Sequence, residues 1–150
     1  MVDHHTFKTF NLDHQKLGFI GKNIGRNLSL LYRGSRDGFD TSPIHQCCSG
    51  AHPTLLLVKS EYGKVFGAYI SIPWLEQQQD ASETKAFLFS LDTQEIFTLK
   101  RTVKAHVRFD SCTMVGFNGG SKGTDLMIQS ECNKRQISHS KLGCMFNVPM

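Results

Sequence analysis

The clearest pattern in the chain is a pair of apolar segments separated by a polar turn. TLLLVKS begins at Thr54, VFGAYISIPW begins at Val65, and the EYGK between them is typical of a turn. We therefore predict an antiparallel hairpin. Because alternate residues of a strand share a face, Phe66 and Ala68 lie on one side and Val65 and Tyr69 on the other. The first side is apolar and the second is mixed, so we expect one face of the hairpin to pack on a core.

The rest of the chain continues this alternation of short apolar runs and turn residues. Pro73 lacks an N–H donor and should end the second strand, with Trp74 packed against the chain's own core. The polar segment 75–85 has no aromatic residue and is predicted to be an exposed, mobile loop. The glycine-rich segment 116–125 is predicted to be a loop between strands. Further strands are predicted at AFLFSL (86–91), IFTLK (96–100), HVRFD (106–110), MVGF (114–117), DLMIQS (125–130) and CMFNV (144–148).

Helical signals are confined to the first third of the chain. Apolar residues at helical spacing after Asp13, a suitable N-cap, predict one short helix over 12–24 that glycines weaken. Ser42 followed by proline is typical of an N-cap and a first helical residue, so a second helix is predicted over 43–48. The segment LSLLY (28–32) predicts a strand or a helix end that leads into a loop.

Together these elements indicate the class of fold. Many short strands, with two short helices near the N-terminus, predict a mainly β (α+β) fold, an antiparallel two-sheet β-sandwich with short flanking helices. The length of 150 residues fits a single domain over 1–150. Hydrophobic residues make up 39% of the chain, which is enough to build a buried core.

Charge and hydropathy argue against two classes of protein, those that bind nucleic acid and those that span a membrane. A net charge of +4 with dispersed basic residues is too modest to indicate nucleic-acid binding. We interpret the densest basic group, Lys100, Arg101, Lys104 and Arg108, as a solvated edge or loop. The longest apolar run, 55–58, is far too short to span a bilayer, and no targeting signal is visible. A cytoplasmic location is expected, with only indirect association at vacuolar, lysosomal or other membranes.

The cysteines are the first candidates for chemistry. Five cysteines at irregular spacing suggest reduced, buried, structural thiols, and they offer no zinc pattern. His45, Cys47, Cys48 and His52 lie close in sequence, so a thiol nucleophile with an imidazole base is a possible interpretation. No orienting Asn or Asp is identifiable, and a structural role is preferred. No catalytic, cofactor-binding or metal-binding residue is therefore predicted.

A second candidate is the polar cluster of Arg33, Ser35, Arg36 and Asp37. A bidentate contact between arginine and carboxylate there could organise a surface for a partner, or it could brace the loop. Asp37 followed by glycine is itself a turn signal, which favours bracing. We therefore treat Arg33, Arg36 and Asp37 as residues for partner binding or fold bracing.

Three segments carry a family likeness: LLYRGSRDGF (30–39), HPTLLLVKSEYGKVFGAYISIPW (52–74) and AFLFSL. The later segments GFNGG, TDLMIQSECN and SKLGCMFNVP follow in the same order. Over nearly its whole length the chain resembles the TLDc domain family. Thr124 stands where histidine often precedes the aspartate, and Cys144 stands where a histidine ending is common. A function that rests on a histidine at either place is not expected here.

The resemblance implies a sandwich of two antiparallel sheets and a class of function. TLDc proteins are associated with oxidative-stress resistance and membrane traffic, and several bind the vacuolar proton-pumping ATPase. The expected function is therefore a non-enzymatic protein-interaction domain that regulates this pump, without a cofactor. One alternative is a structural subunit of a large cytoskeletal or membrane-associated assembly. Another is a thiol-based redox protein.

Overall fold

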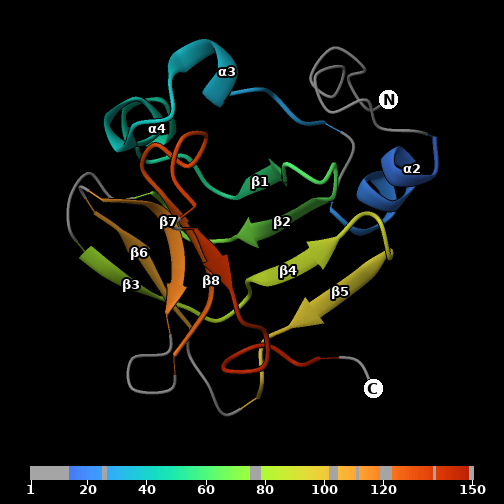
Figure 1. The fold of residues 1–150 in the computed structure, drawn as a ribbon. Helices are drawn as coiled ribbons and strands as arrows, with labels where there is room; N and C mark the ends of the chain where they lie inside the picture. Colours follow the sequence, from blue (N-terminus) through green and yellow to red (C-terminus); the bar gives the residue numbers. More distant parts are fainter. Residues whose placement is uncertain are drawn as a thin grey trace.

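The protein folds as two antiparallel sheets with helices in its N-terminal third (Figure 1). The computed structural model describes residues 14–24, 27–74, 79–101, 105–110, 112–118, 123–136 and 138–148. The helices are α2 (His14–Asn23), α3 (Gly34–Asp37) and α4 (Thr41–Cys48). The strands are β1 (Thr54–Lys59), β2 (Val65–Ile70), β3 (Gln79–Glu83), β4 (Phe87–Ser90), β5 (Glu95–Thr98), β6 (Ala105–Phe109), β7 (Thr113–Asn118), β8 (Thr124–Gln129) and β9 (His139–Ser140).

The strands divide into a four-stranded sheet of order β1-β2-β4-β5 and a five-stranded sheet of order β3-β6-β7-β8-β9. The predicted hairpin is confirmed as β1 and β2, with Thr54 opposite Ile70 and Lys59 opposite Val65. The main core includes Ile70 and Leu88 of the first sheet and Val107 and Phe117 of the second. The predicted β-sandwich is therefore confirmed, and Trp74 is buried in its core as expected.

Both faces of the hairpin are packed, which corrects the expectation of a single packed face. Ala68 and Ile70 belong to the main core, whereas Val65 lies in a second apolar cluster on the opposite face. Ile20 of α2 is fully buried in that second cluster. The alternating pattern identified the strands but not the helix that covers their outer side, because α2 comes from a distant part of the chain.

The segment 75–85 is not an exposed loop throughout. Gln79–Glu83 form strand β3, where Ala81 pairs with Val107 of β6. Residues 75–78 lie outside the described part of the chain. A polar edge strand shows neither the apolar alternation nor the β-branched residues by which strands are found in a sequence, which explains why the prediction failed.

Other predicted elements also differ. Residues 28–32 belong to neither a helix nor a strand, and residues 144–148 form only an isolated bridge between Phe146 and Leu99. The final described strand is instead β9.

Helix α4 starts at Thr41 with Asp40 in the N-cap position, so Ser42 lies inside the helix. The loop predicted over 116–125 is shorter, because β7 extends to Asn118 and β8 begins at Thr124; residues 119–122 lie outside the described part.

A buried carboxylate joins the two sheets. Glu83, at the end of β3, has an exposed fraction of 0%. Its side chain accepts hydrogen bonds from the backbone N–H groups of Ser71 (2.7 Å) and Ile72 (3.2 Å), just after β2, and from those of Thr84 and Lys85 (2.7 Å each). Burial raises the pKa of Glu83, but these bonds outweigh it and hold the pKa below its usual value.

A second buried carboxylate fastens the C-terminal segment. Asp125 of β8 accepts hydrogen bonds from the backbone N–H groups of Gly143 (2.7 Å), Cys144 (3.1 Å) and Met145 (2.7 Å). The same segment reaches the other sheet, because the Asn147 N–H donates to the Thr98 carbonyl at 2.8 Å. Residues 143–147 therefore connect β8 with the end of β5.

Within the described residues, no helix is long and apolar enough to cross a membrane.

We predict that Glu83→Gln destabilises the fold by about 3 kcal/mol. Both carboxylate oxygens of Glu83 accept backbone N–H groups, so either orientation of the glutamine amide places an NH₂ group against another donor. Urea unfolding measures the difference. Glu61→Gln, which removes an exposed carboxylate from the turn between β1 and β2, is the control and should change stability by less than about 0.5 kcal/mol. Equal effects of the two substitutions would contradict this role of Glu83.

Candidate functional site

The sequence-predicted polar cluster lies on a loop outside the sandwich. Residues 30–39, here called the signature loop, include α3 and lead into α4 (Figure 1). Leu30 and Leu31 expose 36% and 41% of their surface, which is high for leucine in a folded domain. Ser35 and Arg36 are also exposed. Apolar and cationic side chains therefore reach solvent from one short segment.

The three candidate residues of this loop form one connected group. The Arg36 guanidinium contacts the Asp37 carboxylate in a bidentate pair, with Nε to Oδ1 at 2.6 Å and Nη2 to Oδ2 at 2.7 Å. The same Oδ2 accepts the backbone N–H of Arg33 at 2.8 Å. The Arg36 side-chain bond first, and then the Arg33 N–H, lower the pKa of Asp37 to about 2. The structure thus brings Arg36 and Asp37 together through side chains and includes Arg33 through its backbone.

The closure of the loop depends on an aromatic hydroxyl and a glycine. The Tyr32 hydroxyl donates to the Gly38 carbonyl. Gly38 has φ of 99°, a conformation that L side chains rarely adopt. Burial, and then the negative charges of neighbouring Cys132 and Asp37, raise the pKa of Tyr32 to about 12. The hydroxyl therefore remains protonated and able to donate across the physiological pH range.

The signature loop lies beside the turn after β8, residues 130–136, here called the adjoining turn. The Glu131 N–H donates to the Phe39 carbonyl at 2.7 Å. The Glu131 carboxylate pairs with Arg135 at 2.9 Å and Lys134 at 3.7 Å, and both basic side chains are largely exposed. Sequence reasoning missed this juxtaposition, because no local pattern indicates that segments about ninety residues apart meet.

The cysteines match the expectation of buried thiols only in part. Cys48 is buried, whereas Cys47 and Cys112 are exposed. Cys47 follows the solvent side of α4, because adjacent residues of a helix point in different directions. Burial raises the pKa of Cys48 to about 11, which disfavours its nucleophilic thiolate.

The two histidines near these cysteines contact backbone carbonyls. Nε2 of His45 lies 3.2 Å from the Met114 carbonyl oxygen, and Nδ1 of His52 lies 3.0 Å from that of Gly50. These contacts give both imidazole rings structural roles. In the described part of the chain, no group of three or more His, Cys, Asp or Glu residues is placed to hold a metal ion.

The predicted basic edge is only partly solvated. Lys100 is half-buried, and its ammonium group donates to the Gly143 carbonyl, so it helps to hold the C-terminal segment. Arg101 is exposed. Lys104 and the side chain of Arg108 lie outside the described part of the structure.

We predict that the Asp37 carboxyl titrates near pH 2 and that Arg36→Gln moves its pKa up toward the usual 3.8. Because the folded-state pKa is lowered, Asp37 contributes to stability above its usual pKa, and this contribution is lost as the pH falls toward about 2. NMR of the side-chain carboxyl carbon measures the titration. Arg135→Gln, whose partner is Glu131, is the control and should leave the Asp37 pKa unchanged. An Asp37 pKa of 3.8 in the unmodified protein would contradict the bidentate pair.

Comparisons with known proteins place the sequence among its relatives. The sequence model of the TLDc domain matches residues 9–150. TBC1 domain family member 24 of Xenopus tropicalis is 34% identical over 58 residues, which are 39% of this chain and 10% of that protein. The chain thus matches only about a tenth of the length of this curated relative. TLDc domains are protein-interaction domains, generally non-enzymatic and linked to oxidative-stress resistance. Because the match covers nearly the entire sequence, this chain belongs to the TLDc family.

Proposed function

We propose that this domain is a non-catalytic binding module that regulates the vacuolar proton-pumping ATPase. The pump is suggested by the family resemblance, in which several members bind it. The proposed contact surface consists of the signature loop and the adjoining turn. On this proposal, Arg36 has two roles, because its guanidinium braces Asp37 while part of it remains available to a partner.

The observation that carries the proposal is the preorganised signature loop. Its polar groups bond to one another, while Leu30, Leu31 and 53% of the Arg36 side chain face solvent. Protein interfaces combine apolar contacts with arginine, which is enriched among the residues that contribute most to affinity. A loop already held in one conformation loses less entropy on binding than a flexible one. These properties favour a protein partner.

The adjoining turn extends this surface and adds charge. Arg135 and Lys134 expose more than half of their side chains, and Glu131 lies between the loop and these cations. Exposed charges at the edge of an interface mainly affect the rate at which two proteins associate and the choice of partner. We therefore expect Leu31 and Arg36 to contribute most of the affinity, with the adjoining turn adding selectivity.

A thiol-based function has one supporting observation. Cys47 is exposed. Against this function, the adjacent Cys48 has its pKa raised to about 11 by burial. The binding function explains more of the loop, including its exposed leucines.

We predict that a tagged, folded chain retains subunits of the proton pump from its native cytosol, and that Leu31→Ser and Arg36→Gln each reduce recovery at least about tenfold. Mass spectrometry at two salt concentrations identifies what remains bound. Tyr62→Ser is the matched control, because Tyr62 is 82% exposed but lies in the turn between β1 and β2.

The salt series separates a regulator from a permanent subunit. A regulator should dissociate as salt rises, whereas a subunit of a cytoskeletal or membrane-associated assembly should remain bound. Recovery of the pump that is equal for all three variants would contradict the proposed surface, and its absence from the unmodified chain would contradict the proposed partner.

A further inference from the structure

Helix α2 covers an apolar face that lies away from the main core. Leu88 of β4 lies in the main core, whereas the next residue, Phe89, lies in the cluster that α2 covers. Figure 1 shows α2 next to the four-stranded sheet and away from the five-stranded sheet. The side chains beneath α2 include Val65, Phe89 and Leu91, all buried. Helix α2 contributes Ile20 and Phe19, and Ile24 follows directly after the helix. A soluble protein rarely exposes an apolar patch of this extent, so this face requires a cover.

The helix that provides the cover is intrinsically weak. It has only 10 residues, fewer than an isolated helix needs to be stable in water. Gly18 and Gly21 lie inside it, and each disfavours the helix about fivefold relative to alanine. Residues 27–33, which lead from α2 toward α3, contain no helix or strand. The helical form of α2 therefore depends on its contact with the sheet.

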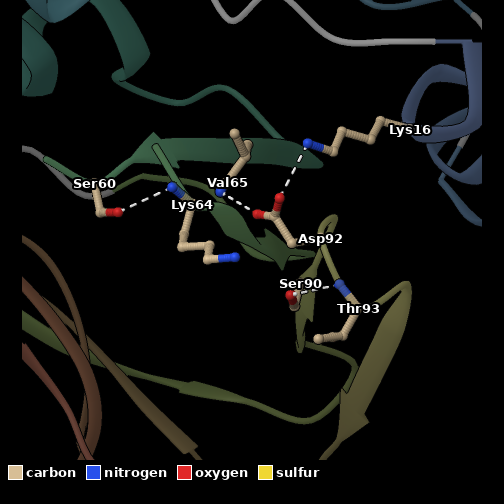
Figure 2. Close-up of polar contacts among 7 residues, drawn as sticks. All are labelled: Lys16, Ser60, Lys64, Val65, Ser90, Asp92 and Thr93. Atoms are coloured by element: carbon tan, nitrogen blue, oxygen red, sulfur yellow. Dashed lines mark hydrogen bonds and ion pairs between the residues drawn. The ribbon is translucent and has the colours of Figure 1, made fainter. Parts of the chain in front are cut away.

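Asp92 fastens α2 to the sheet in a way that permits release. Figure 2 shows Asp92 between the Lys16 ammonium and the backbone of Val65. Asp92 Oδ1 accepts from Lys16 Nζ at 3.0 Å, and Oδ2 accepts the Val65 N–H at 2.6 Å. The bond to Val65 joins the start of β2 to the turn between β4 and β5 and does not involve α2. The end of the sheet therefore keeps its polar contact when α2 leaves.

We propose that α2 is a displaceable cover, and that the outer face of the four-stranded sheet accepts an amphipathic helix of a partner protein in its place. The occupant is defined by complementarity to this face. It must offer two apolar side chains one turn apart, as Ile20 and Ile24 are, and a basic residue that reaches Asp92, as Lys16 does. This face is distinct from the signature loop, so the inference does not depend on the proposed regulation of the proton pump.

Hydrogen exchange of the full chain, followed by mass spectrometry, tests the release of α2. The amides of α2 should exchange well before those of β2 and β4, because opening the helix does not require unfolding the sandwich. Gly18→Ala should slow exchange in α2 about fivefold, since among the described residues no atom beyond the helix backbone and the two chain neighbours lies within 4 Å of the added methyl group. Lys16→Gln should accelerate it about two- to fivefold. Lys59→Gln, an exposed change at the end of β1, is the control and should have no effect on α2.

Binding of a helix from outside is tested with a fluorescent peptide of residues 13–27 that carries Gly18→Ala. The peptide should bind the full chain, and Lys16→Gln in the chain should tighten binding about two- to fivefold, because only the resident helix is weakened. Asp92→Asn should leave the affinity of the chain for the peptide nearly unchanged. It weakens the contact of α2 with the sheet and the contact of the peptide with the sheet equally. Exchange of α2 at the same rate as β2 and β4, or absence of peptide binding to both the unmodified and Lys16→Gln chains, would overturn the proposal.

Discussion

The buried carboxylate of Glu83 is the contact on which the two-sheet arrangement depends. A charge that is removed from water is tolerated only when other groups replace the lost hydration, and here backbone N–H groups from the ends of two strands provide it. Since these donors lie after β2 in one sheet and after β3 in the other, the charge specifies how the sheets meet. Asp125 acts similarly by accepting hydrogen bonds from the backbone of residues 143–145. The same segment then contacts the end of β5 through Asn147. The hydrogen bonds of both carboxylates therefore join parts of the scaffold.

This scaffold positions the proposed binding surface. The turn after β8 is fixed by the five-stranded sheet, and through Glu131 it holds the Phe39 end of the signature loop. Asp37 and Tyr32 then close the loop on itself, so Leu31 and Arg36 are presented from a supported backbone. Bracing and binding are therefore compatible roles in this loop. The hydrogen bonds of Asp37 support the exposed side chains beside it.

Sequence reasoning identified the parts of the fold whose information is local. Apolar runs flanked by turn residues identified β1, β2, β4 and β5, and helical spacing identified α2. Elements whose stability comes from distant segments were not identified. β3 is polar because it is an edge strand, and Glu83 shows nothing in the sequence that distinguishes it from a surface glutamate. The candidate residues Arg36 and Asp37 were found because they are adjacent, whereas Glu131 became relevant only through its contact with Phe39.

The central claim is that the signature loop and the adjoining turn form one preorganised surface for a protein partner. A hydrogen-exchange footprint of the domain, free and bound to the purified cytosolic sector of the proton pump, tests it most directly. The account predicts slower exchange on binding in residues 27–39 and 130–136, with little change in β4 and β5. Protection confined to other segments, with these two unchanged, would contradict it.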